Sequence, residues 1–288
     1  MRNTPSPSYS FEIFPPKGHV ELDSIFKTID ELATLQPDLI SVTYGAGGTS
    51  RENTVEIASK IQNSYENIEA VAHLTCVGAT KKSLDEILNK LRQNGVKNIL
   101  ALRGDLVEGE PLGEFKYASD LISYIKKNYD FKIFAACYPE KHPEAINLET
   151  DIENLKRKVD LGADELITQL FFDNETFLRF RDKLCAAGIK VPIETGIMPI
   201  TSATQVTRMV NMCGASLPPV IQKKLDSFGH DSVAMKEAGI LYAIEQISDL
   251  LTADVDGIHL YTMNQPDIAK RITESIQGIL SSKRAKRV

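Results

Sequence analysis

Cysteine is scarce in this chain, and its spacing excludes the common cysteine-based sites. The 288 residues contain no C-x-x-C pair, and the thiols lie tens of residues apart, at Cys76, Cys137, Cys185 and Cys213. Zinc sites need closely spaced cysteine and histidine ligands, and neither His73 nor His142 has a second histidine at a chelating spacing. We therefore expect buried free thiols in a reducing cytosol and no metal site.

Long apolar runs are missing as well. No run approaches the roughly 20 residues that span a bilayer. The first five residues contain no apolar core of the kind that a secretory signal needs. The sequence therefore predicts a cytoplasmic protein that does not bind membranes.

Positive charge is not in excess, because the formal net charge is −6. Nucleic acids and anionic membranes attract proteins through clustered lysine and arginine. The one basic cluster is terminal, and we interpret residues 281–288 as a solvated tail; the cluster consists of Lys283, Arg284, Lys286 and Arg287. The hydrophobic share of 42% supplies ample core material for a globular fold and excludes a disordered chain.

Strand-like and helix-like segments alternate along the whole chain. The predicted strands cover residues 9–14, 38–44, 70–76, 98–103, 132–138, 165–171, 192–197 and 257–262. Between them the apolar residues recur at helical spacing. Gly95, Gly162 and Gly188 each precede a predicted strand, where glycine suits the left-handed residue that ends a helix.

Eight strand–helix repeats without a linker favour one closed (β/α)8 barrel over residues 1–288, with a short flexible N-terminus. Several strands are rich in valine, isoleucine and leucine on both faces, which is typical of a parallel sheet under helices. An open doubly wound sheet could use the same units. Extra helices are predicted before the last strand, where they would cover the site, at residues 201–212, 218–225 and 233–250.

Polar residues gather at the predicted carboxyl ends of the strands, which is where barrel enzymes place their chemistry. Glu12 is the most informative, because it stands between Phe11 and Ile13. Desolvation beside apolar groups would raise its pKa and make it a general acid near neutral pH. The alternative is a structural glutamate that forms a salt bridge on the barrel floor.

A glycine-rich segment at residues 45–50 resembles the start of a dinucleotide-binding turn. The G-x-G-x-x-G pattern would need glycine at position 50, where the chain has Ser50. We interpret Ser50 as the N-cap of a helix that begins at Arg51, and the segment as a flexible loop over a ligand.

The helix predicted after the fifth strand has two distinct faces. Asp151, Asn154 and Lys158 share a polar face, while Ile152 and Leu155 belong to an apolar one. The polar face could simply be solvated. With the neighbouring arginine at position 157 and the strand-end cluster before it, it could instead hold ribose hydroxyls and a diphosphate.

Nine motifs in this chain resemble, in order, those of the methylenetetrahydrofolate reductase family. They are SFEIFPP at 10–16, SVTYGA at 41–46, HLTC at 73–76, LRGD at 102–105, YASDL at 117–121, YPE with HPEA at 138–145, NLKRKVD at 154–160, ITQ at 167–169 and LYTMN at 260–264. The resemblance implies a (β/α)8 barrel with noncovalent FAD, at which NADH or NADPH and a folate take turns. It also implies a place in one-carbon metabolism and methionine biosynthesis.

The same resemblance implies the residues of the site. The FAD contacts would be Thr43, His73, Arg103, Gly104, Asp105, Tyr117, Ala118, Tyr138, His142, Asp151, Asn154, Arg157 and Lys158. Glu12 would donate the proton that opens the folate ring, and Asp105 would bind the pterin edge. The other substrate contacts would be Gln169, Gln205, Tyr261 and Gln265.

Two positions depart from the family pattern on the folate side. Gln265 stands where many bacterial members have an arginine that helps to hold the folate tail, and Met209 stands where a phenylalanine is expected. Three rivals remain open: another pterin-binding barrel transferase, an aldolase, and a flavin- or folate-binding barrel without turnover. An aldolase of the Schiff-base kind would need a lysine on an interior strand, and Lys132 lies at the wrong end of its strand. The partners implied are small molecules, and a homo-oligomer is compatible with them.

Overall fold

The computed structural model describes residues 6–16, 22–44, 48–106 and 113–285. In this part of the chain, parallel strands follow one another in the order β1 to β8 and form a closed barrel. The strands are β1 Ser8–Ile13, β2 Leu39–Val42, β3 Glu69–Thr75, β4 Asn98–Leu102, β5 Lys132–Cys137, β6 Glu165–Thr168, β7 Ile193–Ile197 and β8 Gly257–Tyr261. This order confirms the predicted (β/α)8 barrel.

Helices connect the successive strands. They are α1 Asp23–Ala33, α2 Gly48–Ser64, α3 Lys81–Gln93, α4 Ala118–Asn128, α5 Leu148–Asp160, α6 Asn174–Ala186, α7 Ala203–Cys213, α8 Pro219–Phe228, α9 Ser232–Thr252 and α10 Pro266–Ala285. The helices predicted before the last strand are confirmed as α7, α8 and α9. Gly95, Gly162 and Gly188 all have positive φ angles, as predicted for helix ends.

The chain falls into two compact units. The first unit comprises Met1–Tyr9, Cys137–Lys156 and Ile167–Val288, and the second comprises Ser10–Ala136 and Arg157–Leu166. The boundaries between them run within β1, β5, α5 and β6. The predicted single domain over residues 1–288 stays a prediction.

In the second unit, parallel ladders fix the height of each strand against its neighbours. Glu12 pairs with Ser41 across β1 and β2, and Ser41 pairs with Val71 across β2 and β3. Phe11 and Ile13, on the opposite face of β1, are fully buried. Ser10, on the same face as Glu12, is also buried. Both faces of β1 are therefore packed at Ser10 and Phe11, as the apolar composition of the strands predicts.

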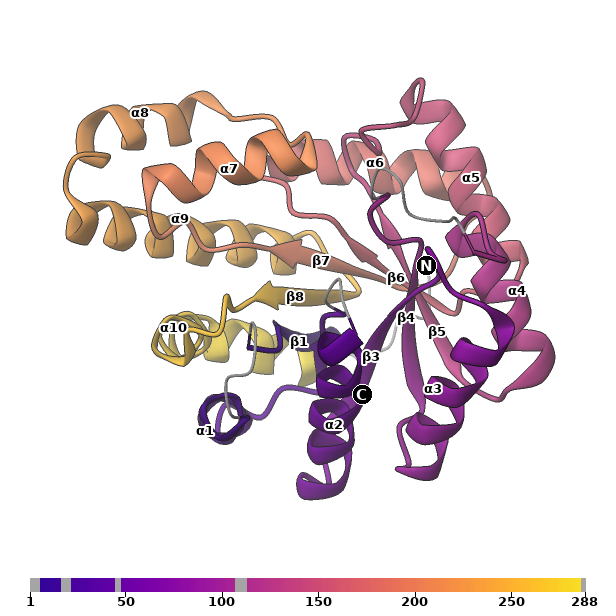
Figure 1. Cartoon of the computed structure of the whole chain (residues 1–288). Coiled ribbons are helices and arrows are strands. Elements are labelled where there is room, and N and C mark those ends of the chain that lie inside the picture. The colour runs from indigo at the N-terminus through magenta and orange to yellow at the C-terminus, as the bar shows by residue number, and fades with distance from the viewer. Residues whose placement is uncertain (1–5, 17–21, 45–47, 107–112, 286–288) are drawn as a thin grey trace. The chain divides into compact units, whose positions relative to one another are not determined.

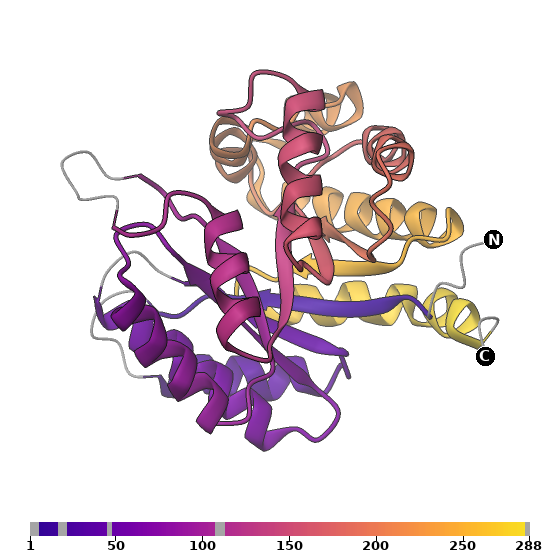
Figure 2. The ribbon, with the colours of Figure 1, turned by 90° about the vertical axis from the view of Figure 1, so that its right-hand side faces the viewer.

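The helices of the second unit bury the stripes that the sequence predicts. On α1 the buried residues include Ile25 and Ile29, and on α3 they include Leu84 and Leu88. The α3 helix begins at a capping box in which the Thr80 hydroxyl accepts the backbone N–H of the third helical residue. Helices α2 and α3 pack side by side (Figures 1 and 2).

In the first unit, the inserted helices have a small core of their own. Buried side chains after β6, after β7 and on α7 to α9 form this cluster: Leu170, Phe172, Met198, Ile200, Val206, Ala215, Ile221 and Met235. Met209, the residue that departs from the family pattern, packs against the cluster. The insertion is thus anchored to the ends of β6 and β7 by apolar packing.

A polar network is buried where β1, β7 and β8 begin. The Ser8 hydroxyl donates to Glu194 Oε1 at 2.8 Å, and His259 Nδ1 lies 3.4 Å from Glu194 Oε2. Both Glu194 and His259 are fully buried. Glu12, the candidate for a structural glutamate on the barrel floor, lies near the carboxyl end of β1, whereas Glu194 lies near the amino end of β7.

Among the predicted boundaries that are wrong, two concern α10 and α2. Residues 281–285 belong to α10 rather than to a solvated tail, because Lys283 Nζ bonds Asp254 and Arg284 Nε donates to the Pro7 carbonyl at 3.1 Å. Helix α2 begins at Gly48 and not at Arg51. The first turn tolerates glycine and small polar residues, because its N–H groups have no intrahelical partner in any case. Residues 1–5, 45–47 and 286–288 lie outside the described part.

A glycine pair tests how closely α9 packs. A Cβ at Gly239 would lie 1.9 Å from the Ile200 carbonyl oxygen, whereas a Cβ at Gly278 on α10 would meet nothing within 4 Å. Gly239→Ala should destabilise the fold by about 1–3 kcal/mol because the backbones must separate. Gly278→Ala should stabilise it by roughly 0.5–1 kcal/mol. Urea unfolding midpoints measure both, and a Gly239→Ala midpoint equal to that of wild type would show that α9 packs more loosely.

Candidate functional site

Glu12 and His73 meet at the inner face of the second unit. Glu12 Oε2 lies 3.5 Å from His73 Nε2, and their side chains are 18% and 6% exposed. The ladders explain the contact: Glu12 is level with Val71, and His73 follows two residues later on the same face of β3. The sequence places both at strand ends but does not predict that they touch. A carboxyl and an imidazole at this distance can share or pass a proton.

The loop after β4 is held tightly against the end of β3. The Val77 N–H donates to the Arg103 carbonyl at 2.8 Å, and Arg103 Nε donates to the Gly104 carbonyl at 3.2 Å. Gly104 has φ +89°, and a Cβ there would lie 2.7 Å from Val77 Cγ1. Only glycine fits this position. In this loop Arg103 and Gly104 are partly buried, whereas Asp105 is exposed.

The N-terminus of α4 lies beside the end of β3. Asp120 accepts the backbone N–H of Tyr117 at 2.9 Å, and Cys76 Sγ donates to the Tyr117 carbonyl at 3.5 Å. The ring of Tyr117 is 48% exposed, and Ala118 is the first residue of the helix. An exposed aromatic ring on a fixed backbone is suited to stacking on a planar ligand.

At the end of β2, Thr43 is fixed through its backbone. Its N–H donates to the Ile13 carbonyl at 3.0 Å, and its carbonyl accepts the Thr54 hydroxyl at 2.9 Å. Both bonds are made by the main chain of Thr43, and the residue is partly exposed.

In the first unit, the loop after β5 brings Tyr138, His142 and Asp151 together. The rings of Tyr138 and His142 form a T-shaped pair with centroids 4.7 Å apart. The His142 backbone N–H donates to Asp151 Oδ2 at 2.8 Å. His142 Nδ1 accepts the Glu144 N–H at 3.1 Å, so Nε2 is the nitrogen that carries the proton.

Helix α5 carries the remaining members of the polar face. Asn154 and Arg157 are exposed, and Lys158 Nζ donates to the Ala136 carbonyl at 2.8 Å. Ile152 and Leu155 are buried, as predicted. Asp151 and Lys158 therefore support neighbouring backbone, while Asn154 and Arg157 present their groups to solvent.

Two glutamines of the first unit engage their carbonyl oxygens locally. Gln169 Oε1 accepts the Leu170 N–H at 2.8 Å. Gln205 Oε1 accepts both the N–H and the hydroxyl of Thr201 at 2.7 Å. Each glutamine therefore offers its amide NH2 group as a hydrogen-bond donor to a ligand.

The end of β8 is tied to the end of β6. The Tyr261 hydroxyl donates to the Thr168 carbonyl at 2.7 Å, and Thr168 Oγ1 accepts the Gly196 N–H at 2.8 Å. Gln265 follows in the turn to α10, where its N–H donates to the Thr262 carbonyl at 2.9 Å. Tyr261 thus has a structural bond that the sequence did not indicate.

The contact between Glu140 and Ser216 is not predicted from the sequence. The Ser216 N–H donates to both carboxylate oxygens of Glu140, each at 2.9 Å. The Ser216 hydroxyl also donates to this carboxylate. This joins the loop that carries His142 to the segment between α7 and α8. Its position inside the motif at 138–145 was the only available signal.

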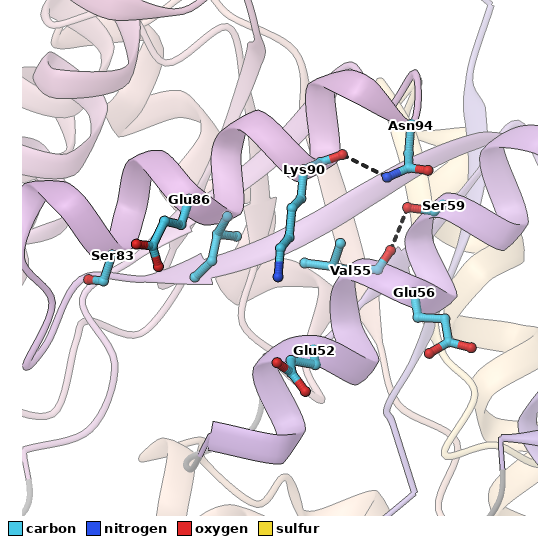
Figure 3. A pocket seen from close by; sticks show the side chains of 9 residues that line it. Glu52, Val55, Glu56, Ser59, Ser83, Glu86, Lys90 and Asn94 are labelled. Carbon is cyan, nitrogen blue, oxygen red and sulfur yellow. Dashed lines mark hydrogen bonds between the residues drawn. The ribbon is translucent and has the colours of Figure 1, made fainter.

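A groove of about 460 Å³ lies between α2 and α3, away from these residues. Figure 3 shows acidic side chains from both helices around it, including Glu52 and Glu86, while Lys90 points from α3 towards α2. Its described lining contains none of the predicted site residues. We interpret it as the notch between two neighbouring helices.

Neither a metal centre nor a membrane span is found in the described residues. In residues 6–16, 22–44, 48–106 and 113–285, no three histidine, cysteine, aspartate or glutamate side chains are grouped as metal ligands. Among the helices of the same ranges, none has the length and apolar character needed to cross a bilayer.

Comparison with known proteins gives one consistent result. The family model described as methylenetetrahydrofolate reductase matches residues 1–277. The chain is 39% identical over 267 residues to the 5,10-methylenetetrahydrofolate reductase of Escherichia coli (strain K12), covering 93% of this chain and 90% of the relative. It is 37% identical to methylenetetrahydrofolate reductase (NADH) 1 of Arabidopsis thaliana, covering 89% of this chain and 46% of the relative.

Solved structures share the fold at low identity. A Clostridium thermocellum protein that binds two copies of 5-methyl-5,6,7,8-tetrahydrofolic acid matches with a TM-score of 0.61 and 15% identity, covering 99% of this chain and 96% of the other. A dihydropteroate synthase from Xanthomonas albilineans matches with a TM-score of 0.56 and 10% identity, covering 95% and 93%. These likenesses support the barrel and nothing further.

The thiols test the packing at the end of β3. Burial, together with the Asp120 carboxylate, raises the pKa of the Cys76 thiol to about 11. At pH 8 roughly one Cys76 thiol in a thousand is then a thiolate, which is the reactive form. Iodoacetamide at pH 8 should label the exposed Cys185 and spare Cys76, as read by peptide mass spectrometry. Labelling in urea controls for intrinsic reactivity, and equal rates at both cysteines in the folded protein would contradict the packing.

Proposed function

The chain belongs to the methylenetetrahydrofolate reductase family, and on that premise we propose that it reduces 5,10-methylenetetrahydrofolate to 5-methyltetrahydrofolate with NADH or NADPH through bound FAD. The match covers residues from both units, including every predicted site residue. The observation that carries the proposal is the Glu12–His73 contact, because the reaction needs a proton donor near the carboxyl ends of the strands. A cytoplasmic location and small-molecule partners follow from the same proposal.

The residues of each unit fit the chemical parts of FAD. In the second unit the exposed ring of Tyr117 suits a planar ring system, and the exposed guanidinium of Arg157 suits a diphosphate. In the first unit, protonated Nε2 of His142 supplies a donor, and exposed Asn154 suits a hydroxyl. Asp151 fixes the backbone of His142, so we assign it a positioning role.

The remaining residues of the proposed FAD set are assigned from the family resemblance. Arg103, Gly104 and Asp105 would meet it along the loop after β4, whose backbone can approach a ligand closely because position 104 has no side chain. His73, Thr43, Ala118, Tyr138 and Lys158 complete the set. When bound, FAD would supply the redox chemistry of hydride transfer.

Glu12 supplies the acid in this proposal. Its carboxyl proton passes to the amine nitrogen that leaves the methylene bridge when the imidazolidine ring of the folate opens. His73, 3.5 Å from Glu12, holds the carboxyl in place and is near enough to exchange a proton with it between turnovers. Partial burial of both groups strengthens this interaction relative to bulk water.

The other proposed substrate contacts include two amide donors and one carboxylate. The NH2 groups of Gln169 and Gln205 can donate to carbonyl oxygens of a pterin or a nicotinamide. The exposed Asp105 carboxylate accepts from the pterin edge, and the Tyr261 ring is held by the bond from its hydroxyl to the Thr168 carbonyl. These groups orient the substrate, which is how a protein most assists a cofactor-driven reaction.

The flavin itself gives the first test. The purified protein should contain FAD rather than FMN, because the proposal assigns Asn154 and Arg157 to the part of the cofactor beyond the flavin ring. Releasing the flavin by heat and identifying it by chromatography decides between the two. FMN, or no flavin in folded protein supplied with FAD, would contradict the assignment. Arg157→Ala should lower FAD occupancy by about tenfold, as expected for a charge-assisted hydrogen bond.

Glu12→Gln separates the two half-reactions. The variant keeps the size of the side chain but lacks the transferable proton, and general acid catalysis contributes roughly 10²–10⁴-fold. Reduction by nicotinamide should stay within about tenfold of wild type, while reoxidation by methylenetetrahydrofolate should fall at least about a hundredfold. Stopped-flow flavin absorbance measures both rates.

Glu69→Gln is the matched control, because Glu69 lies at the amino end of β3. It should leave both half-reactions unchanged. If both rates fell together in Glu12→Gln, Glu12 would organise the site rather than donate the proton, and if neither fell, the proton would come from another group.

A further inference from the structure

The contact between Glu12 and His73 crosses a strand that lies between them. Glu12 is on β1 and His73 is on β3, and β2 pairs with both of these strands. The ladders set Ser41 of β2 level with Glu12 on one side and with Val71 on the other. Residues that pair in a parallel ladder have their side chains on the same face of the sheet. The Glu12 carboxyl therefore reaches His73 across the inner face of β2, where Ser41 is the residue at its own level.

The Ser41 hydroxyl is buried without a hydrogen bond. Ser41 is fully buried, and among the residues that the structure describes its Oγ has no hydrogen-bond partner. A buried hydroxyl of this kind destabilises the folded state, because it has given up its hydrogen bonds to water. Alanine would occupy nearly the same space without that penalty. Packing alone therefore does not explain the hydroxyl, whereas an acceptor that comes within its reach would.

Glu12 is the acceptor that the register favours. Neighbouring strands lie about 4.8 Å apart, so a glutamate carboxyl can reach a hydroxyl at its own level on the next strand by a rotation of its side chain. On the face that β2, β3 and β4 share with Glu12 in the second unit, the titratable side chains of the described residues are Glu69 and His73. Glu69 lies at the amino end of β3, where it accepts the Asn98 amide at 3.0 Å. Glu12 is thus the carboxyl group to which Ser41 can donate.

We propose that Ser41 is a positioning residue for proton donation by Glu12, whose carboxylate accepts a hydrogen bond from the Ser41 hydroxyl once the proton has left. The inference rests on the proposed function, in which the O–H bond of Glu12 breaks. The departing amine nitrogen of the folate keeps the electron pair of its C–N bond and takes this proton. Before the transfer, the Glu12 carboxyl lies 3.5 Å from His73. After it, the carboxylate rotates to the Ser41 hydroxyl, and a hydrogen bond to the charged form favours loss of the proton.

The acidity of Glu12 tests the inference in the FAD-loaded protein without folate. Carbon-13 NMR of protein labelled at the glutamate carboxyls follows the titration, and the spectrum of Glu12→Gln identifies the Glu12 signal. Ser41→Ala should raise the pKa of Glu12 by about one pH unit, because a hydrogen bond to the charged form is removed. Ser41→Cys keeps the size with a weaker donor and should give a smaller rise.

Ser59→Ala is the matched control for the loss of a serine hydroxyl in the second unit. The Ser59 hydroxyl donates to the Val55 carbonyl at 2.6 Å within α2 (Figure 3). This variant should leave the pKa of Glu12 at its wild-type value.

The same change should appear when methylenetetrahydrofolate reoxidises the flavin. This step needs protonated Glu12, so its rate falls as the pH rises through the pKa of that group. In Ser41→Ala the fall should move about one pH unit higher, and the rate at low pH should drop about threefold, because a weaker acid donates its proton more slowly. Reduction by nicotinamide needs no proton from Glu12 and should keep its wild-type pH profile.

Stability separates this role from a purely structural one. Below the pKa of Glu12 the Ser41 hydroxyl has no hydrogen bond to lose, so the urea midpoint of Ser41→Ala should equal or exceed that of wild type. A lower midpoint with an unchanged pKa of Glu12 would show a structural role and overturn the inference. An unchanged pKa in a variant that folate still reoxidises would overturn the inference and leave the proposed function intact. Because the titration needs no folate, a raised pKa in a protein whose wild type is not reoxidised by folate would contradict the proposed function alone.

Discussion

The parallel ladder from β1 to β3 is the constraint on which the candidate chemistry depends. Hydrogen bonding between the strands sets Glu12 level with Val71, and the two-residue period of β3 then brings His73 to the same face. Packing of Phe11 on the opposite face leaves Glu12 no choice of side. A shift of the ladder by one residue would turn the carboxyl towards the helices and away from His73.

Much of the fold can be predicted from the sequence, because a strand buried on both faces and a helix buried on one have different apolar periods. The ends of elements are less predictable. β6 leaves the ladder after Thr168 although Phe171 and Phe172 remain buried, since an apolar run reports burial rather than strand pairing. Ser50 has the chemistry of an N-cap, yet α2 already begins at Gly48.

The candidate site also has features that can be predicted from the sequence and features that cannot. Residue types at the strand ends are predictable, because each motif is local and barrels concentrate their chemistry there. The partners of those residues are not, since they depend on register and on segments far apart in the chain. Glu12 beside His73 and Glu140 on Ser216 are of this kind. The left-handed Met263 has no signal in the sequence at all, because only glycine, asparagine and aspartate commonly indicate that conformation.

The central claim is that one protein-bound flavin connects a nicotinamide to a folate. The most direct measurement follows flavin absorbance of the wild-type protein without oxygen, first with NADH or NADPH and then, after the nucleotide is removed, with 5,10-methylenetetrahydrofolate. The account predicts that the nucleotide bleaches the flavin, that the folate restores its colour, and that one 5-methyltetrahydrofolate forms for each flavin reoxidised. A flavin that is bleached by the nucleotide but not reoxidised by the folate would contradict it.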